Sequence, residues 1–356
     1  MTPEKPVFHQ RFPSRGAALL LRTGVLAGLF LGCGNGGGGT QPDPGPEPEL
    51  ACPSAGSGIE VGGDPGSEDT TVTPERRVVL MGGGAEDNDA MTRFLEGAAG
   101  GDVLVLRASG SLTSYPNYFQ SLAPSPSPSS ATTVRSTVPA AAGDPAVLCW
   151  VAGAEAIWLA GGNQWNYLGG WPVELHEALA QANARGVAIG GTSAGAVSLG
   201  EAAFDARFGT VTSSEALADP LHPDVSVSHP SFALPELQGM LVDSHFMERN
   251  REGRLLAFLA RFLTEGERGE VVGLGLDEGV ALVIREATFR VFGPPGRAAW
   301  LYRVRGPATL EEGQPLSLSG ILRARLYPGD QGSWPLSFDT ISTRAMRVTR
   351  GLVEGL

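Results

Sequence analysis

The segment GVAIGGTSAGAVSL, residues 186–199, predicts a short apolar strand, a tight turn and the start of a helix. Gly191 and Gly195 flank Ser193 in the pattern G-x-S-x-G, which places a serine hydroxyl on an exposed, strained turn. The first backbone N–H groups of the following helix would point to the same place and could hold an oxyanion. Because glycine-rich turns of this kind also bind phosphates or simply connect two elements, the pattern alone leaves a catalytic role open.

The same order of strand, glycine-rich turn and helix recurs before this turn. Expected strands cover residues 76–81, 102–106, 132–138 and 156–160, and expected helices cover residues 88–98, 115–122, 144–154 and 172–185. Strands that alternate with helices at this spacing predict an α/β fold with a mostly parallel sheet flanked by helices. Ligand sites of such sheets lie at the carboxyl ends of the strands, where these glycine-rich turns fall.

Beyond residue 200 the pattern is less regular. We expect an extended segment at residues 225–229, an apolar run at 241–246 that leads into a helix from about 247 to 263, and a strand at 280–284. The chain after Thr288 has the pattern of short strands joined by turns and indicates no function by itself.

Composition limits the class of protein. The chain has 356 residues, 42% of them hydrophobic, so it can bury a large core and is not disordered as a whole. Its formal net charge of −12 argues against a nucleic-acid-binding surface, because phosphate binding needs clustered Lys and Arg. Neither a Cys-x-x-Cys pair nor a histidine-rich spacing occurs, so we expect no metal and no organic cofactor.

The first 32 residues have the features of an export signal. Four basic residues come first, Lys5, Arg11, Arg15 and Arg22. The apolar run that follows, residues 25–31, is too short to span a bilayer. It ends in Leu31-Gly32-Cys33, which resembles a bacterial lipoprotein signal with Cys33 as the lipidated first residue of the mature chain. We therefore expect an extracytoplasmic protein of the bacterial cell envelope, lipid-anchored at Cys33 or secreted, with a retained anchor as an alternative.

Residues 33–75 are rich in Gly, Pro, Asp, Glu and Ser, which predicts a disordered linker between the signal and one folded domain at residues 76–356. Cys52 falls in this linker and Cys149 in an apolar, helix-like run. An oxidising compartment would permit a disulfide between them. A free, buried thiol at Cys149 is nevertheless the simpler expectation.

A serine nucleophile needs a base. Of the five histidines, His245 stands where an apolar run meets a helix, which is the same kind of position as that of Ser193. His245 is therefore the favoured base, and His229 is the next candidate.

The base usually needs a carboxylate that orients it. Asp277 and Glu278 follow the glycine-rich run 273–276 at a strand end, and Glu278 is the favoured residue. Asp243 is closer to the histidine in sequence, but it could simply cap the following helix. The order Ser193, His245, Glu278 differs from that of α/β-hydrolases, in which the acid precedes the histidine.

Four motifs together resemble the cyanophycinase and aspartyl dipeptidase (peptidase E) family of serine peptidases. They are GGNQ at 161–164, GTSAGA at 191–196, DSHF at 243–246 with the arginines that follow, and GLGLDE at 273–278. The resemblance covers about residues 78–284, and four motifs in order are far more specific than the serine turn alone. It implies a class I glutamine-amidotransferase-like fold with flavodoxin-like layering, and it makes residues 76–356 the catalytic domain.

The resemblance implies that Ser193, His245 and Glu278 act as a catalytic triad. It places Gln164 and the Gly161-Gly162 backbone near the substrate, and backbone N–H groups of Gly162 and Ala194 near the oxyanion. Amide hydrolysis would then proceed through an acyl-enzyme intermediate.

The resemblance also implies a substrate class. Cyanophycinases hydrolyse cyanophycin, a poly-aspartate that carries arginines on isopeptide bonds, and release β-aspartyl-arginine. Arg249 and Arg254, with Asp243 in the same region, are expected to bind substrate and its carboxylates. Arg251 is expected on a solvated charged face of the helix.

Two departures from the family pattern concern the substrate. Ser244 stands where glutamine is common, and Asn163 stands where aspartate is frequent. Other β-aspartyl or acidic peptides are therefore equally good candidates. A binding lipoprotein without turnover and an esterase that uses the same serine remain alternatives, and homodimerisation stays open.

Overall fold

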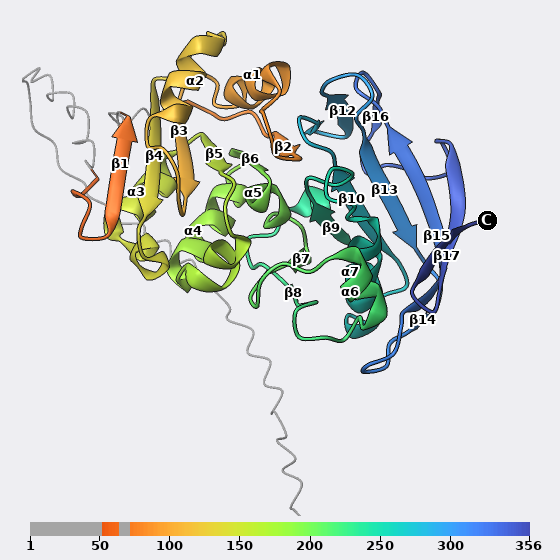
Figure 1. Ribbon diagram of the computed structural model, residues 1–356. Coiled ribbons are helices and arrows are strands. Elements are labelled where there is room, and N and C mark those ends of the chain that lie inside the picture. Colours follow the sequence, from red (N-terminus) through yellow and green to blue (C-terminus); the bar gives the residue numbers. More distant parts are fainter. Residues whose placement is uncertain (1–51, 64–71) are drawn as a thin grey trace, which may run out of the picture. The chain divides into compact units, whose positions relative to one another are not determined.

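The computed structural model describes residues 52–63 and 72–356, which belong to one compact unit (Figure 1). The predicted signal segment with Cys33, and most of the predicted linker, lie outside the described residues. Within the described part of the chain, no helix combines the length and the apolar composition that crossing a membrane would require.

The first of the two large sheets is the predicted α/β sheet. Its strand order is β1-β4-β3-β5-β6-β2-β11-β12-β16. The central strands are parallel: β4 (Ser130–Ser136), β3 (Asp102–Arg107), β5 (Ala156–Leu159), β6 (Ala188–Thr192) and β2 (Val78–Met81). Antiparallel strands extend both edges: β1 (Ile59–Gly63) on one side, and β11 (Ala281–Arg285), β12 (Thr288–Phe292) and β16 (Gln331–Ser333) on the other.

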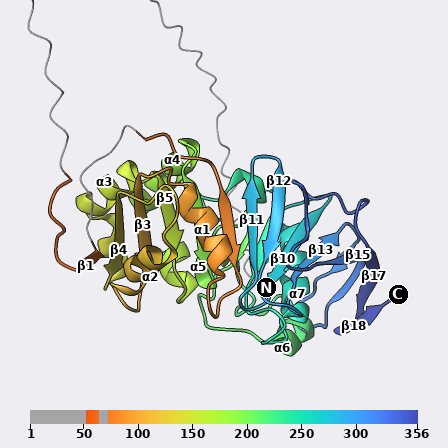
Figure 2. The same ribbon diagram turned by 90° about the horizontal axis from the view of Figure 1, so that it is seen from above.

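Helices cover both faces of these parallel strands (Figures 1 and 2). Alternate strand residues such as Val79 and Val105 pack against α1 (Asn88–Glu96) and α2 (Ser114–Leu122). Their neighbours, such as Leu80 and Leu106, pack against α3 (Pro145–Gly153) and α4 (Val173–Ala184). Because successive strand residues point to opposite faces, both faces must be apolar, which explains the uninterrupted hydrophobic runs in the sequence. The predicted fold class is confirmed.

The chain after the serine turn builds a second sheet with the strand order β18-β17-β15-β13-β10-β9. Its strands are β9 (Met240–Asp243), β10 (Val271–Leu276), β13 (Ala299–Val304), β15 (Ser317–Leu326), β17 (Thr343–Thr349) and β18 (Leu352–Gly355), with β14 (Ala308–Thr309) paired to β15. Strands β9 and β10 are parallel, and the others are antiparallel. Of the strands expected from Thr288 onward, β12 and β16 extend the first sheet, and the others complete the second.

A second apolar core lies under the long helix of this half. Leu255, Phe258, Leu259 and Phe262 of α7 (Glu252–Glu265) pack against the second sheet. The short helix α6 (Ser213–Ala218) joins the same core, as does the antiparallel pair of β7 (Ala203–Phe204) and β8 (Val227–Ser228). The expected extended segment at 225–229 is thus present.

Helix α7 begins at Glu252, and its predicted start at Met247 is wrong. Residues 247–250 form an exposed turn in which Asn250 has φ 49°. The Arg251 N–H closes the turn by donating to the Phe246 carbonyl at 2.9 Å. The arginines that sequence periodicity places on one helix therefore divide between a turn and a helix.

The predicted linker and the predicted free thiol both need correction. Cys52 and Cys149 form a disulfide with a Cα–Cα distance of 5.6 Å. The pairing follows from β1, which lies antiparallel to β4, and from the Gly56 N–H, which donates at 3.0 Å to the carboxylate of Asp144 at the start of α3. Residues 52–63 are thus part of the folded domain. In the chain-entropy model, closing a loop of 97 residues stabilises the fold by about 5 kcal/mol.

Candidate active site

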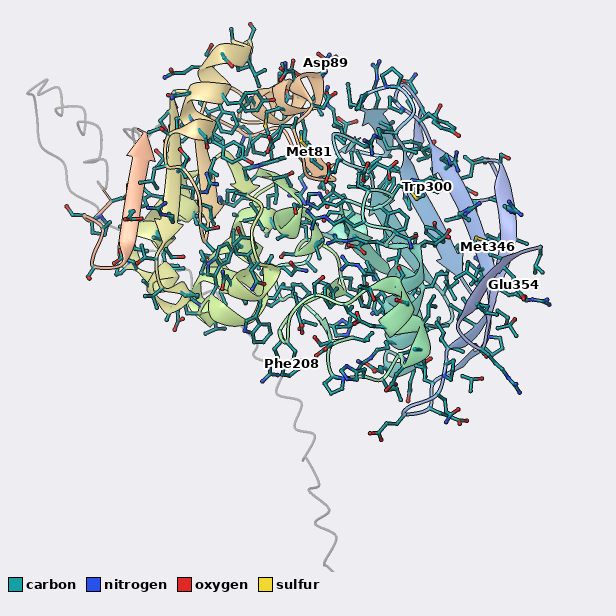
Figure 3. All side chains as sticks on the ribbon, in the orientation of Figure 1. Met81, Asp89, Phe208, Trp300, Met346 and Glu354 are labelled. Atoms are coloured by element: carbon teal, nitrogen blue, oxygen red, sulfur yellow. A yellow bond between two sulfur atoms is a disulfide. The ribbon has the colours of Figure 1, made fainter. Side chains whose placement is uncertain are left out.

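Ser193 occupies the predicted tight turn between β6 and the short helix α5 (Ala194–Val197). Its backbone has φ 52° and ψ −120°, a combination that L-residues rarely adopt. The Ser193 N–H donates to the carbonyl of Met81 at 3.0 Å, which fixes the turn to the end of β2. Met81, labelled in Figure 3, shows where this turn lies in the molecule.

The second glycine of the G-x-S-x-G pattern has a steric reason. A Cβ atom at Gly195 would lie 2.0 Å from the carbonyl oxygen of Leu159. The start of α5 therefore packs backbone to backbone on the end of β5, and only glycine permits this approach.

His245 follows β9 and is held against the end of β2. Its N–H donates to the Gly82 carbonyl at 2.7 Å, and its own backbone is left-handed, with φ 47°. A Cβ atom at Gly83 would lie 2.4 Å from the imidazole Cε1 atom. The ring thus lies directly on the Gly83 backbone, which gives this glycine a role that its sequence context does not reveal.

Ser193, His245 and Glu278 form a continuous hydrogen-bonded chain. Ser193 Oγ lies 2.8 Å from His245 Nε2, and His245 Nδ1 lies 2.6 Å from Glu278 Oε1. The three side chains follow β6, β9 and β10, so the carboxyl ends of strands from both sheets meet here. The structure brings together the three residues that the sequence analysis selected, in hydrogen-bonding geometry suited to a nucleophile, a base and an orienting acid.

The neighbouring carboxylate has a structural task. Asp277 is buried and accepts hydrogen bonds from the Met247 N–H, the Ala298 N–H and the Trp300 indole N–H, at 2.9 to 3.1 Å. These bonds join the His245 turn to the second sheet. Because Asp277 faces the scaffold, Glu278 is left to face the imidazole. His229, the alternative base, instead approaches the Glu201 carbonyl at 3.2 Å and packs on Phe262.

A cavity of about 230 Å³ opens beside Ser193. It is lined by Gly162, Asn163, Gln164, Ser193, Ala194, Phe204, Ala206, Gly209, Thr210, Ser244, Arg249, Arg251 and Arg254. The Gln164 amide N–H donates to the Phe204 carbonyl at 3.2 Å and so connects the two sides of the cavity. The loop at residues 204–210, which the sequence analysis did not single out, contributes one wall. Its composition carries no recognisable signal for this role.

Three arginines line this cavity, and they differ in burial and in their bonding partners. Arg249 is exposed and forms no ion pair with any residue that the structure describes. Arg251 donates to the Ser244 carbonyl at 2.6 Å, and burial lowers the pKa of its guanidinium to about 10. The expected solvated face for Arg251 is therefore wrong, because the residue precedes α7 and turns inward.

Arg254 and Asp243 differ most from expectation. Asp243 is 1% exposed and accepts two hydrogen bonds from Arg254, at 2.6 and 2.8 Å. Arg254 also lies over the rings of Phe204 and Phe258. Its guanidinium is thus occupied within the protein, and Asp243 does not line the cavity. The predicted substrate contacts of this pair are not supported, since both residues serve to hold the site together.

The predicted oxyanion donors lie beside the nucleophile. Ala194 directly follows Ser193, and a Cβ atom at Gly161 would lie 3.4 Å from that of Ser193. Among the described residues, neither the Ala194 N–H nor the Gly162 N–H has a backbone acceptor. The Ser193 N–H is already used by Met81, so Ala194 and Gly162 are the available pair. No group of His, Cys, Asp and Glu suited to a metal ion occurs in residues 52–63 or 72–356.

Burial and charge both act on the histidine. Desolvation lowers the pKa of His245 below its usual value, and the nearby positive charges of Arg249 and Arg251 lower it further, against the opposing effect of Glu278. A histidine that is neutral at physiological pH is ready to accept a proton.

This shift predicts a pH profile. For a base, kcat/KM rises with pH as the imidazole loses its proton, so we expect the acidic limb at a pH below the usual histidine pKa. Replacing Arg249 by glutamine removes one positive charge, raises the pKa of His245 and moves the limb to higher pH. Initial rates measured from pH 4 to 9 with the parent and Arg249→Gln enzymes test this sign. A limb that moves to lower pH in the variant would contradict it.

A serine, a histidine and a glutamate joined at the ends of parallel strands define the class of serine hydrolases. Comparison of the sequence with models of known families narrows this class. Residues 138–292, which contain all three residues, match the model of peptidase family S51. This match confirms the predicted peptidase E/cyanophycinase-like assignment.

Two solved structures are similar to this one. A peptidase from an acI-B1 actinobacterium is 15% identical, with a TM-score of 0.47, over 74% of this chain and 98% of the other. A protein described as a peptidase E from Listeria monocytogenes EGD-e is 14% identical, with a TM-score of 0.38, over 62% of this chain and 98% of the other. A search of curated proteins gave no match.

Proposed function

We propose that this protein is a serine peptidase that cleaves β-aspartyl bonds, in cyanophycin or in related peptides, through an acyl-enzyme. The observation that carries the proposal is the hydrogen-bonded chain from Ser193 through His245 to Glu278. Membership of peptidase family S51 supports peptide hydrolysis. The polar cavity beside Ser193 supports a small, charged substrate.

The mechanism follows from these contacts. Ser193 Oγ attacks the amide carbonyl while His245 Nε2 takes the hydroxyl proton, and the N–H groups of Gly162 and Ala194 stabilise the oxyanion. His245 then gives the proton to the leaving amine, and the acyl-enzyme forms. A water molecule, deprotonated by His245, hydrolyses the ester. Glu278 holds the imidazole tautomer and stabilises the imidazolium throughout.

Arg249 is the group best suited to hold a substrate carboxylate. It lines the cavity, and within the described residues it is the one arginine of the three there that forms no ion pair. A β-aspartyl residue presents a free α-carboxylate next to the bond that is cleaved. The pairing of that carboxylate with Arg249 would favour β-linked over α-linked aspartyl peptides.

A substrate panel tests the proposal. We expect β-Asp-Arg, β-Asp-Lys and cyanophycin to be cleaved and α-Asp dipeptides to be cleaved poorly. Arg249→Gln should lower kcat/KM for β-linked substrates about tenfold, mainly through KM, because a carboxylate contact is lost. Arg347→Gln, which alters an exposed strand residue of β17, is the matched control and should have no effect. Equal rates on α- and β-linked substrates would reject the β-aspartyl specificity.

The cellular location belongs to the same proposal. We place residues 1–32 in an export signal and the catalytic domain outside the cytoplasm, lipid-anchored at Cys33 or secreted. The disulfide between Cys52 and Cys149 supports this location, because disulfides persist in oxidising compartments.

A further inference from the structure

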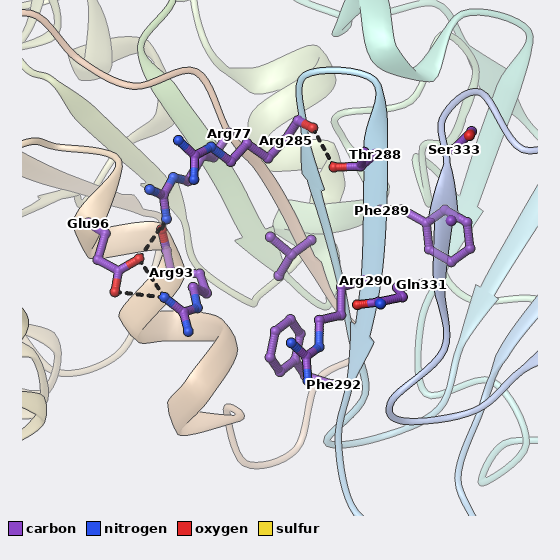
Figure 4. Close-up of a pocket in the computed structure, with 12 residues that line it drawn as sticks. Arg77, Arg93, Glu96, Arg285, Thr288, Phe289, Arg290, Phe292, Gln331 and Ser333 are labelled. Atoms are coloured by element: carbon purple, nitrogen blue, oxygen red, sulfur yellow. Dashed lines mark hydrogen bonds and ion pairs between the residues drawn. The ribbon is translucent and has the colours of Figure 1, made fainter.

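A second cavity, of about 520 Å³, is lined by residues of α1 and of the edge strands of the first sheet (Figure 4), and it lies at the end of β2 opposite the active site. Arg77 immediately precedes β2 and lines this cavity, whereas Gly82 immediately follows β2 and contacts His245. The two sites are therefore separated by the length of a buried strand. The volume falls within the range of small-ligand sites.

The floor of this cavity is one face of the edge strands. Arg285 pairs with Thr288, and Thr288 pairs with Ser333; one row further, Arg290 pairs with Gln331. Directly paired residues point to the same side of a sheet, so these polar side chains share one face. Helix α1 forms the other wall and contributes Arg93 and Glu96 (Figure 4).

The cavity carries more positive than negative charge. Four guanidinium groups line it, those of Arg77, Arg93, Arg285 and Arg290. Two carboxylates form ion pairs with three of them. Glu96 pairs with Arg77 and Arg93, and Glu75 pairs with Arg77 and, at 3.3 Å, with Arg285. The excess is notable in a chain whose formal net charge is −12.

Two of the arginines have unused hydrogen-bonding capacity. Arg290 forms no ion pair with any described residue and instead lies over the ring of Phe292 at 5.1 Å. Arg77 is 5% exposed, and its Nε atom is buried without a hydrogen-bond acceptor in the described structure. An unpaired buried donor is costly unless a ligand satisfies it.

We propose that this cavity binds the carboxylates of an acidic peptide. Arg285 and Arg290 lie diagonally on neighbouring strands, so their backbones are roughly 7–8 Å apart. Alternate side chains of an extended peptide repeat at roughly 7 Å, and successive acidic residues on one side of such a peptide therefore match the two guanidinium groups. A single compact anion would need donors that converge on one point. The guanidinium groups of Arg285 and Arg290 are instead spread along the sheet, which favours an extended ligand. The site would hold an acidic chain outside the catalytic cavity.

The test uses the full chain with Ser193→Ala, so that a bound peptide is not cleaved. Calorimetric titration with hexa-aspartate is compared with hexa-asparagine and with inorganic phosphate. We expect hexa-aspartate to bind, and we expect Arg285→Gln/Arg290→Gln to weaken that binding about tenfold, because two charge-assisted contacts are lost. Arg344→Gln, which alters an exposed residue of β17, is the matched control and should change nothing. Thermal unfolding of each variant verifies the fold.

Three results would overturn the proposal. They are equal affinity of the double variant and the parent for hexa-aspartate, equal binding of hexa-asparagine, and binding of phosphate at this site without binding of hexa-aspartate. The catalytic proposal is tested separately, because the double variant keeps Ser193, His245 and Glu278. With Ser193 restored, it should hydrolyse short β-aspartyl substrates at the parent rate even where hexa-aspartate binding is lost.

Discussion

Replacing Ser193 with alanine should lower kcat/KM by about 10⁴-fold or more. The low remaining activity would come from substrate binding and from the oxyanion donors. The substitution deletes the Oγ atom that contacts His245 at 2.8 Å, and with it the acyl-enzyme route. Cβ is retained, so the left-handed turn at Ser193 keeps its steric character. Rates on the β-aspartyl substrates cleaved by the parent measure the effect.

Ser198→Ala provides the matched control for this variant. Ser198 is buried nearby, and its hydroxyl donates to the Ala194 carbonyl at 2.8 Å without contacting His245. Its removal should leave kcat within a few-fold of the parent value. A fluorophosphonate probe should label the parent and Ser198→Ala but not Ser193→Ala. Full activity of Ser193→Ala would rule out the mechanism.

The parallel sheet could be predicted because its signals are local. The buried strands β2, β5 and β6 are short runs of apolar and small residues that lead into glycine-containing turns, and the helices between the strands show helical spacing. The two-sided core explains why the pattern is so clear. The second sheet is less visible in sequence, because β15 and β17 have one exposed face and pair with strands that do not adjoin them through a tight turn.

The edge of the first sheet could not be predicted from composition. Residues 52–63 read as linker because Gly, Pro and acidic residues dominate the neighbouring sequence. Their order depends on pairing with β4 and on the bond between Cys52 and Cys149, both of which are long-range contacts. Sequence separation hides such contacts from a local pattern.

In the candidate site, too, some positions follow from local sequence pattern and others depend on long-range contacts. Ser193, His245 and Glu278 each stand at a strand end, so the topology of the sheets determines where they meet. The arginines do not follow from local pattern. The sequence pattern predicts a charged surface for Arg251 and a substrate contact for Arg254. In the structure, Asp243 and the rings of Phe204 and Phe258 instead hold Arg254 in the interior. Their environment comes from elements distant in sequence.

The buried ion pair of Asp243 and Arg254 gives the second large expected effect, on stability and on kcat. Asp243→Asn should destabilise the fold by about 3 kcal/mol, because Arg254, which is 2% exposed, would keep its charge without a counter-charge. It should also lower kcat. Asp243 accepts the Ser244 N–H at 2.9 Å and contacts Arg251, which in turn donates to the Ser244 carbonyl, so the turn that presents His245 depends on Asp243. Denaturant unfolding and kinetics measure the two effects.

Asp205→Asn is the matched control, because Asp205 is also buried but accepts from the hydroxyls of Ser226 and Ser228 and from the Arg207 N–H. With neutral partners, it should lose only about 1 kcal/mol. The double variant Asp243→Leu/Arg254→Met should regain most of the stability lost in Asp243→Asn, since no uncompensated charge remains buried. It should not regain kcat, because leucine at position 243 offers no acceptor to the Ser244 N–H. Equal destabilisation by Asp243→Asn and Asp205→Asn would show that the ion pair is not the cause.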